Sequence, residues 1–96
     1  MKGSQRKYLR GLAHTFKPHV IVGKNELTDG ALSSIMTCLE AKELMKIKFS
    51  DRKYMKSSKS ILENSLNCHI VGDIGKVLIL YKKNFDKTEN NIVIPD

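Results

Sequence analysis

The sequence is poor in the residues on which exported domains and metal sites depend. It has two cysteines, three tyrosines, three phenylalanines and no tryptophan in 96 residues. Two cysteines are too few for a disulfide framework, and we expect Cys38 and Cys68 to be small buried hydrophobes. Cys68 and His69, even with the distant His14 or His19, form no recognisable ligand set. We therefore expect no metal and no cofactor.

Long apolar runs and catalytic motifs are also missing. The longest apolar run, residues 77–81, is far shorter than the ~20 residues of a membrane-spanning helix. The first six residues include two basic ones and are not followed by the apolar stretch of a signal peptide, so we expect a cytoplasmic protein with no membrane partner. No nucleophile beside a base, carboxylate pair or Walker-type loop is recognisable, so we do not expect an enzyme.

Acidic residues are scarce in two parts of the chain, which carries a formal net charge of +7 and has a pI near 9.5. Residues 1–25 contain six basic residues and no acidic one, and residues 46–59 contain six basic residues and one acidic one. The segment between them, residues 26–45, contains four acidic residues and one basic one. Two basic blocks around an acidic segment favour a polyanion as partner. The alternative is a solvated, lysine-rich surface.

Ninety-six residues are enough for one domain with one core. The spacing of apolar residues predicts three helices and four short strands. In chain order these are a helix at 4–14, a strand at 20–22, a helix at 28–42, a strand at 45–49, a helix at 51–66, and strands at 68–72 and 77–81. Two strand–helix–strand crossovers with parallel strands and a closing hairpin are expected. The fold class is therefore an α/β two-layer sandwich (α+β) with a four-stranded mixed sheet.

The first helix has Ser4 as a candidate N-cap, with Tyr8, Leu9, Leu12 and Ala13 forming its apolar stripe. Its basic side chains lie off this stripe, facing water or a ligand. The strand at 20–22 is wholly apolar, which is typical of a buried strand. The last apolar residues, 92–95, predict either a frayed terminus or a short strand docked on an edge.

The strand at 45–49 alternates Met45, Ile47 and Phe49 with Lys46 and Lys48. Because successive side chains on a strand point to opposite faces, one face should be core and the other basic and exposed to solvent. In the next helix, Asp51 is the candidate N-cap. Tyr54, Met55, Ser58, Ile61, Leu62, Ser65 and Leu66 are expected on its inner face, and Arg52, Lys53, Lys56 and Lys59 on its outer face. A turn is expected at 73–75.

Several of these segments together resemble one known family. The motifs are LRGLAH at 9–14, KP at 17–18, VIVGK at 20–24, LT at 27–28, ELMKIK at 43–48 and IGKVLILYK at 74–82. In this order, over residues 4–83, they resemble the CRM domain (chloroplast RNA splicing and ribosome maturation) in its stand-alone bacterial YhbY-like form. The resemblance implies a CRM domain at 1–84, followed by a polar C-terminal tail at 85–96 that could be docked at its end.

The resemblance also implies a fold like the C-terminal domain of translation initiation factor three, and a function in RNA binding. Stand-alone bacterial members of the family are associated with the precursor of the large ribosomal subunit. The implied partner is therefore ribosomal RNA of that precursor, bound by a ribosome assembly factor, with ribosomal proteins as further candidate partners. The alternative is a protein-binding adaptor on ribosomal particles without direct RNA recognition. We expect a monomer.

The family has a Gly-x-x-Gly loop between the first strand and the second helix, comparable to the loop with which KH domains clamp an RNA backbone. Here the loop reads Gly23-Lys24-Asn25-Glu26, with glutamate in place of the second glycine. Glutamate adds bulk and negative charge beside a phosphate, whereas Lys24 can pair with one. The loop is therefore either an RNA contact or only a turn.

The candidate RNA-binding residues combine this loop, the free amides at the start of the second helix and the two basic blocks. They are Arg6, Lys7, Arg10, His14, Lys17, Gly23, Lys24, Asn25, Glu26, Thr28, Lys46, Lys48, Arg52, Lys53 and Lys56. His14 has an alternative role as the residue that closes the first helix. With so few aromatic residues, recognition of the RNA backbone and shape is favoured over base stacking.

Overall fold

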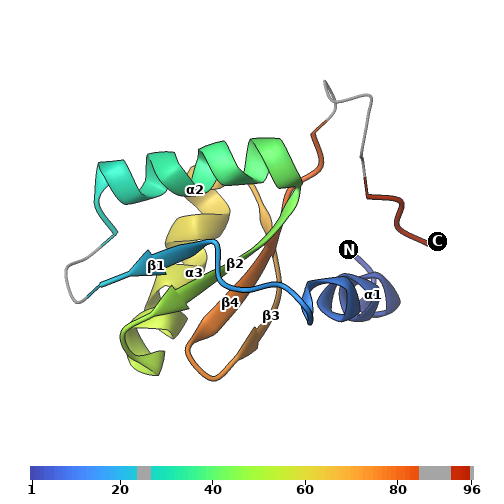
Figure 1. Ribbon diagram of the computed structural model, residues 1–96, viewed down its shortest axis with the longest axis horizontal. Helices are drawn as coiled ribbons and strands as arrows, with labels where there is room; N and C mark the ends of the chain where they lie inside the picture. Colours follow the sequence, from blue (N-terminus) through green and yellow to red (C-terminus); the bar gives the residue numbers. More distant parts are fainter. Residues whose placement is uncertain (24–26, 85–91, 96) are drawn as a thin grey trace.

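A computed structural model of the protein describes residues 1–23, 27–84 and 92–95. Its elements are α1 (Gly3–Ala13), β1 (Val20–Val22), α2 (Asp29–Lys42), β2 (Leu44–Phe49), α3 (Arg52–Leu66), β3 (His69–Ile74) and β4 (Val77–Tyr81). The predicted fold of three helices with a four-stranded mixed sheet is confirmed (Figure 1).

The four strands form one sheet in the order β1-β2-β4-β3. β1 runs parallel to β2, whereas β4 is antiparallel to both β2 and β3. The predicted parallel pairing of the first two strands and the closing hairpin are therefore correct. The expectation of a buried strand at 20–22 is wrong, because β1 is an edge strand and Ile21 is 73% exposed.

The larger core lies between one face of the sheet and helices α2 and α3. Met45, Ile47 and Phe49 of β2 all point into it, as their alternation with lysine predicts. Ile35 and Leu39 of α2 are fully buried against them. Met55, Leu62 and Leu66 of α3, with Ser58, complete the buried inner face of that helix, whereas Ile61 and Ser65 are exposed.

The opposite face of the sheet carries a second, smaller core under α1 (Figure 1). Leu9 and Ala13, one turn apart, are fully buried against residues such as Leu44, Val71, Ile79 and Tyr81. The predicted stripe on this helix was too wide, because Tyr8 and Leu12 are 40% and 37% exposed. A helix that covers only one end of a sheet needs just a narrow apolar contact.

Hydrogen bonds at the helix starts show which residues cap α2 and α3. The Thr28 hydroxyl accepts from the Ala31 N–H at 3.1 Å, and the Asp51 carboxylate accepts from the Tyr54 N–H at 2.7 Å. Each of these bonds gives an acceptor to one backbone N–H in the first turn of its helix. Ser4 is not an N-cap, because α1 begins one residue earlier and Lys2 is in the cap position.

The strand β3 ends two residues later than predicted, and the turn follows at Gly75, whose φ is +59°. A positive φ of this kind is readily adopted by glycine. Asp73, expected in the turn, lies in the strand and accepts hydrogen bonds from Arg52 and Lys59 of α3. These long-range contacts explain why a local turn signal failed here.

Glu43 joins the end of α2 to the C-terminal tail. The residue is fully buried and has a φ of +64°, a backbone conformation that is unfavourable for residues other than glycine. Its backbone N–H donates to the Leu39 carbonyl at 2.8 Å. Its carboxyl oxygens accept from the Asn84 N–H at 2.8 Å and the Ile92 N–H at 2.9 Å. These bonds hold Glu43 in its unusual conformation.

The tail residues 92–95 dock on the α1 side of the sheet. Ile92 and Ile94 are half-buried against the smaller core, and the Gln5 side-chain amide donates to the Pro95 carbonyl at 3.4 Å. This segment is docked, as one of the two alternatives predicted, but it is not a strand.

We expect Glu43→Ala to lower the free energy of unfolding by about 2–3 kcal/mol, because it leaves two partly buried N–H groups without their acceptor. Glu43→Gln keeps one acceptor oxygen and should lose about half as much. Urea unfolding followed by circular dichroism measures both. Equal stability of all three proteins would show that the carboxyl group does not hold the tail.

Candidate nucleic-acid interface

The helix α1 leaves part of its sheet face uncovered. We call this part the open sheet face, defined by Ile21 of β1, Lys46 and Lys48 of β2, Ile74 of β3 and Val77 of β4. The register places Ile21 beside Lys48, and Val77 opposite Lys48 and beside Ile74. Ile21 and Ile74 are 73% and 61% exposed, and Lys48 is exposed. The surface therefore combines apolar side chains with an accessible ammonium group.

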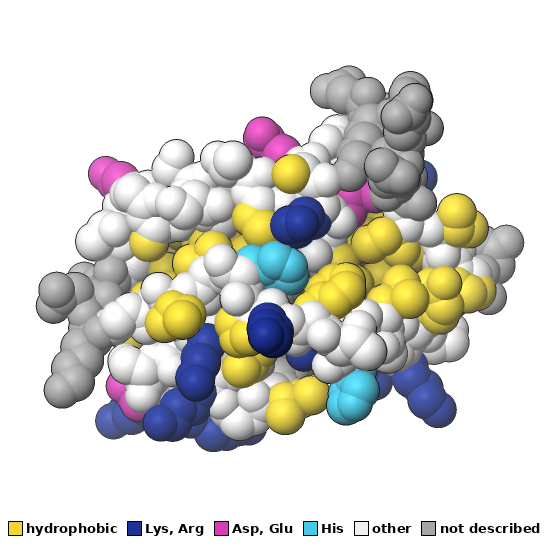
Figure 2. Space-filling model, in the orientation of Figure 1, with side chains coloured by type: hydrophobic (Ala, Val, Ile, Leu, Met, Phe, Trp, Pro, Cys, Tyr) yellow, Lys and Arg dark blue, Asp and Glu magenta, His cyan; other side chains and the backbone are white. Residues whose placement is uncertain are grey.

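Charge is unevenly distributed over the molecule. Figure 2 shows most of the visible lysine and arginine side chains in the lower half of the view and most of the acidic ones in its upper half. The separation follows from the sequence, because α2 comes from the acidic segment and β2 with the start of α3 from the second basic block. A polyanion would be attracted to one side of the protein.

Lys46 differs from the prediction of a solvent-facing lysine. It is half-buried, and its ammonium group donates to the Phe16 carbonyl at 3.0 Å and to the His14 carbonyl at 3.4 Å. These bonds tie the connection between α1 and β1 to the middle of the sheet. Lys46 is thus first a structural residue, and Lys48 is the lysine of β2 that remains exposed.

His19 is a residue that the sequence analysis did not assign to the site. The backbone N–H of His19 donates to the Lys46 carbonyl at 2.9 Å. The ring Nδ1 of His19 accepts from the backbone N–H of Lys46 at 3.2 Å. Burial lowers the pKa of His19, and the nearby charges of Lys42 and Lys46 lower it further. The ring is therefore neutral at pH 7, with its proton on Nε2. Only long-range strand pairing reveals this role, so no local pattern could have predicted it.

Arg10 is a second candidate residue with a structural role. The register between β3 and β4 shifts between Ile70 and Gly72, leaving Val71 in a β-bulge. The Arg10 guanidinium donates to the Val71 carbonyl at 2.9 Å, and its side chain lies directly over Gly72. A Cβ at Gly72 would come within 2.5 Å of the Arg10 Cδ. The expectation that Arg10 faces only water or a ligand is wrong.

Arg52 is likewise engaged within the protein. Its guanidinium donates to the Gly75 carbonyl and forms an ion pair with Asp73 at 3.2 Å, and Lys59 pairs with the same carboxylate at 2.6 Å. The hydrogen bond from Lys59 is the largest cause of a lowered pKa of Asp73. Arg52 therefore fixes the β3–β4 hairpin to α3, on the edge of the open sheet face.

The remaining candidate residues are not gathered in one patch. Arg6 and Lys7 are exposed on α1, His14 closes that helix, and Lys17 is exposed in the connection to β1. Lys53 and Lys56 are exposed on α3, which packs on the other face of the sheet. Gly23 is exposed, and Thr28 caps α2. Lys24, Asn25 and Glu26 lie outside the described residues.

Both cysteines are packed among apolar residues. Cys68 is buried, which raises the pKa of its thiol to about 11, and its Sγ lies 3.6 Å from the Leu62 carbonyl. Burial also raises the pKa of the half-buried Cys38. Within residues 1–23, 27–84 and 92–95, no three histidine, cysteine or acidic side chains come together as metal ligands would. None of the helices described there is long and apolar enough to span a membrane.

A model of the CRS1 / YhbY (CRM) domain family matches residues 1–82. The chain belongs to this family. An RNA-binding protein of Haemophilus influenzae is 35% identical over 80 residues, which are 81% of each chain. YqeI of Bacillus subtilis, named a probable RNA-binding protein, is 30% identical over 99 aligned positions that cover 99% of both chains.

The chain is also similar to a protein of solved structure. The solution structure of a Staphylococcus aureus protein, described as a candidate RNA-binding protein, superposes on this CRM domain with a TM-score of 0.83. The two are 27% identical, and the match covers 99% of both chains. The relatives' names describe binding proteins, in agreement with the prediction that this CRM domain is not an enzyme.

We expect Arg10→Ala to lower the free energy of unfolding by about 1–2 kcal/mol, because the carbonyl of the bulge loses a charged donor. Arg6→Ala removes the same charge from an exposed position of the same helix and should change stability by less than about 0.5 kcal/mol. Urea unfolding of both variants tests this. Similar losses in the two would contradict a structural role for Arg10.

Proposed function

We propose that this CRM domain binds RNA, with the open sheet face as the centre of its contact surface. The exposed Lys48 between apolar residues of neighbouring strands is the observation that carries the assignment. Its ammonium group can pair with a phosphate, and Ile21 and Ile74 offer flat apolar area for sugars and bases. The names of the relatives support RNA as the polyanion.

Exposed basic residues around this surface would extend the contact. Lys17 lies in the connection before β1, and His14 lies at the end of α1, where its carbonyl contacts Lys46. Gly23 and Thr28 flank the loop that resembles a KH-type clamp, at the end of β1 next to Phe49. The contact would rest on backbone phosphates more than on base stacking.

The RNA that we propose is ribosomal RNA of the large-subunit precursor, with the protein acting as an assembly factor. The motifs shared with stand-alone bacterial YhbY-like proteins support this choice. A basic domain of this size also fits such a partner, because a ribosomal particle presents extended phosphate surfaces with irregular shape.

Gradient sedimentation of the protein with ribosomal particles tests this function. We expect co-migration with large-subunit precursor particles at low salt, release at high salt, and release after nuclease treatment. Binding that survives nuclease treatment would instead indicate the alternative, an adaptor that binds ribosomal proteins. A protein that stays at the top of the gradient at low salt would contradict both.

The affinity should depend on salt. If ~5 phosphates are contacted, log affinity should fall with log salt at a slope of about −3 to −4. Lys48→Glu should weaken binding, reduce this slope by about one and leave stability nearly unchanged, because Lys48 is exposed. We choose this single change because reversing Lys46 as well would break its bonds to the Phe16 and His14 carbonyls.

Lys53→Glu is the matched control. It makes the same charge change at an exposed position of α3, on the other side of the sheet. Fluorescence anisotropy with one ribosomal RNA fragment compares the two variants. If Lys53→Glu weakens binding as much as Lys48→Glu, the RNA contact lies on α3 or is diffuse, and the open sheet face is not its centre.

A further inference from the structure

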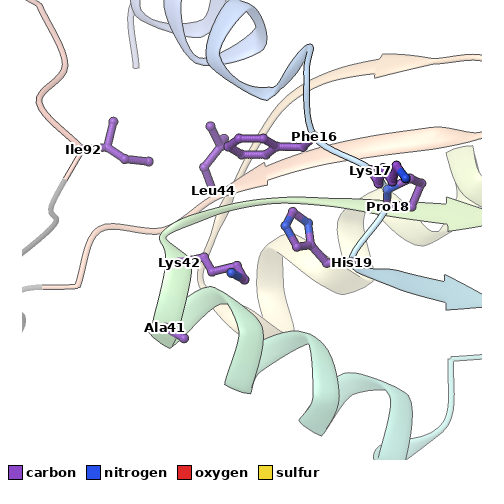
Figure 3. A pocket seen from close by; sticks show the side chains of 8 residues that line it. All are labelled: Phe16, Lys17, Pro18, His19, Ala41, Lys42, Leu44 and Ile92. Atoms are coloured by element: carbon purple, nitrogen blue, oxygen red, sulfur yellow. The ribbon is translucent and has the colours of Figure 1, made fainter.

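A cavity of about 700 Å³ opens between the connection after α1, the end of α2 and the tail (Figure 3). It is lined by Phe16, Lys17, Pro18, His19, Ala41, Lys42, Leu44 and Ile92. Leu44 lies on the same side of β2 as Lys46, so the cavity adjoins the open sheet face. Its volume is in the range of clefts that hold small organic groups.

Two rings form part of the cavity wall. Phe16 and His19 meet edge to face, with ring centroids 5.6 Å apart and planes at 84°. Phe16 is 36% exposed, whereas the rings of Phe49 and Tyr81 are buried. In the part of the chain that the structure describes, Phe16 and Tyr8 are thus the most accessible aromatic rings. A flat partner could stack on Phe16 from the cavity side.

The His19 ring is held in place before any ligand arrives. Its Nδ1 is occupied by the Lys46 N–H, and the lowered pKa keeps the ring neutral, so Nε2–H is its hydrogen-bond donor. In Figure 3 this ring lies below Phe16 and to the right of Lys42. A fixed donor next to a fixed ring suits a flat polar group that can both stack and accept a hydrogen bond.

The charges around the cavity differ from those of a simple phosphate site. Ala41 and Lys42 belong to the last turn of α2, where the negative end of the helix dipole disfavours an anion. Lys42 and Lys17 lie on opposite sides of the His19 ring in Figure 3. The interior therefore favours a neutral group, and the two ammonium groups favour phosphates at the rim.

We propose that this cavity receives one unpaired nucleobase of the bound RNA. Phe16 stacks on the base, His19 donates to an acceptor on its edge, and Lys17 and Lys42 pair with the neighbouring phosphates. The inference rests on the proposed RNA binding and adds one position for base stacking to a surface whose contact with RNA otherwise rests mainly on backbone phosphates. It also implies a preference for single-stranded over fully paired RNA, because a paired base cannot enter the cavity.

Phe16→Ala tests the stacking. The variant should bind a single-stranded RNA oligonucleotide about fivefold more weakly, the lower end of the effect of losing one stacked base, and should bind an RNA duplex as the parent does. Phe16→Tyr keeps a ring and should bind like the parent. Tyr8→Ala removes a similarly exposed ring on α1, outside the cavity, and should have no effect. None of these changes alters charge, so the salt slope should stay constant.

Photo-crosslinking of the parent protein gives a test that does not depend on variants. With an oligonucleotide that carries 4-thiouridine, mass spectrometry should find crosslinks in the segment 16–19. Crosslinks elsewhere alone, or to no position of this segment, would overturn the cavity proposal even if Phe16→Ala failed to fold.

The outcomes separate the two proposals. If the parent binds neither RNA, the proposed function is wrong. If the parent binds and Lys48→Glu weakens binding, but Phe16→Ala binds both RNAs like the parent, only the cavity proposal is overturned. Equal loss of single-stranded and duplex binding in Phe16→Ala would also overturn it, because the ring would then support the surface and not receive a base.

Discussion

The alternation of side chains along β2 is the constraint on which the rest of the structure depends. Because β2 is a central strand, Met45, Ile47 and Phe49 on one face form the floor of the larger core, on which α2 and α3 pack. On the other face, Leu44 is covered by α1, and Lys48 is exposed beyond the end of that helix. One six-residue strand thus determines both where the helices pack and where the protein presents charge.

Between Leu44 and Lys48, Lys46 connects these two regions. Its backbone pairs with His19 and its ammonium group binds two carbonyls of the connection after α1. A lysine stem with an ammonium head can cover apolar surface and still satisfy backbone oxygens. The connection is therefore part of the folded sheet and not a loose link, which is why the Phe16 and His19 rings have a defined arrangement.

The elements and the core face of β2 could be predicted because they follow from local patterns: apolar spacing, the Thr28 and Asp51 caps and the alternation at 45–49. The roles of Arg10 and Asp73 could not. Arg10 pairs with a carbonyl 61 residues away, at a bulge that exists only once β3 and β4 are in register. Periodicity marks a charged side chain as off the apolar stripe, but it does not distinguish solvent from a distant backbone oxygen. The predicted site accordingly includes two arginines that have partners within the protein, Arg10 and Arg52, and it does not include Phe16 or His19.

The hydrogen bonds that Asn84 and Ile92 donate to Glu43 limit which substitutions these two positions can accept. The carboxyl group recognises Asn84 and Ile92 through their main-chain N–H groups, which every residue except proline possesses. For the contact with Glu43, the two anchored positions thus need only a backbone amide. Side-chain identity also matters, because the Asn84 side-chain amide donates to the Glu40 carbonyl at 2.7 Å, and Ile92 and Ile94 meet apolar neighbours. Every substitution at these two positions except proline therefore keeps the N–H that binds the Glu43 carboxyl group, and proline is the substitution that selection should keep out of both anchors.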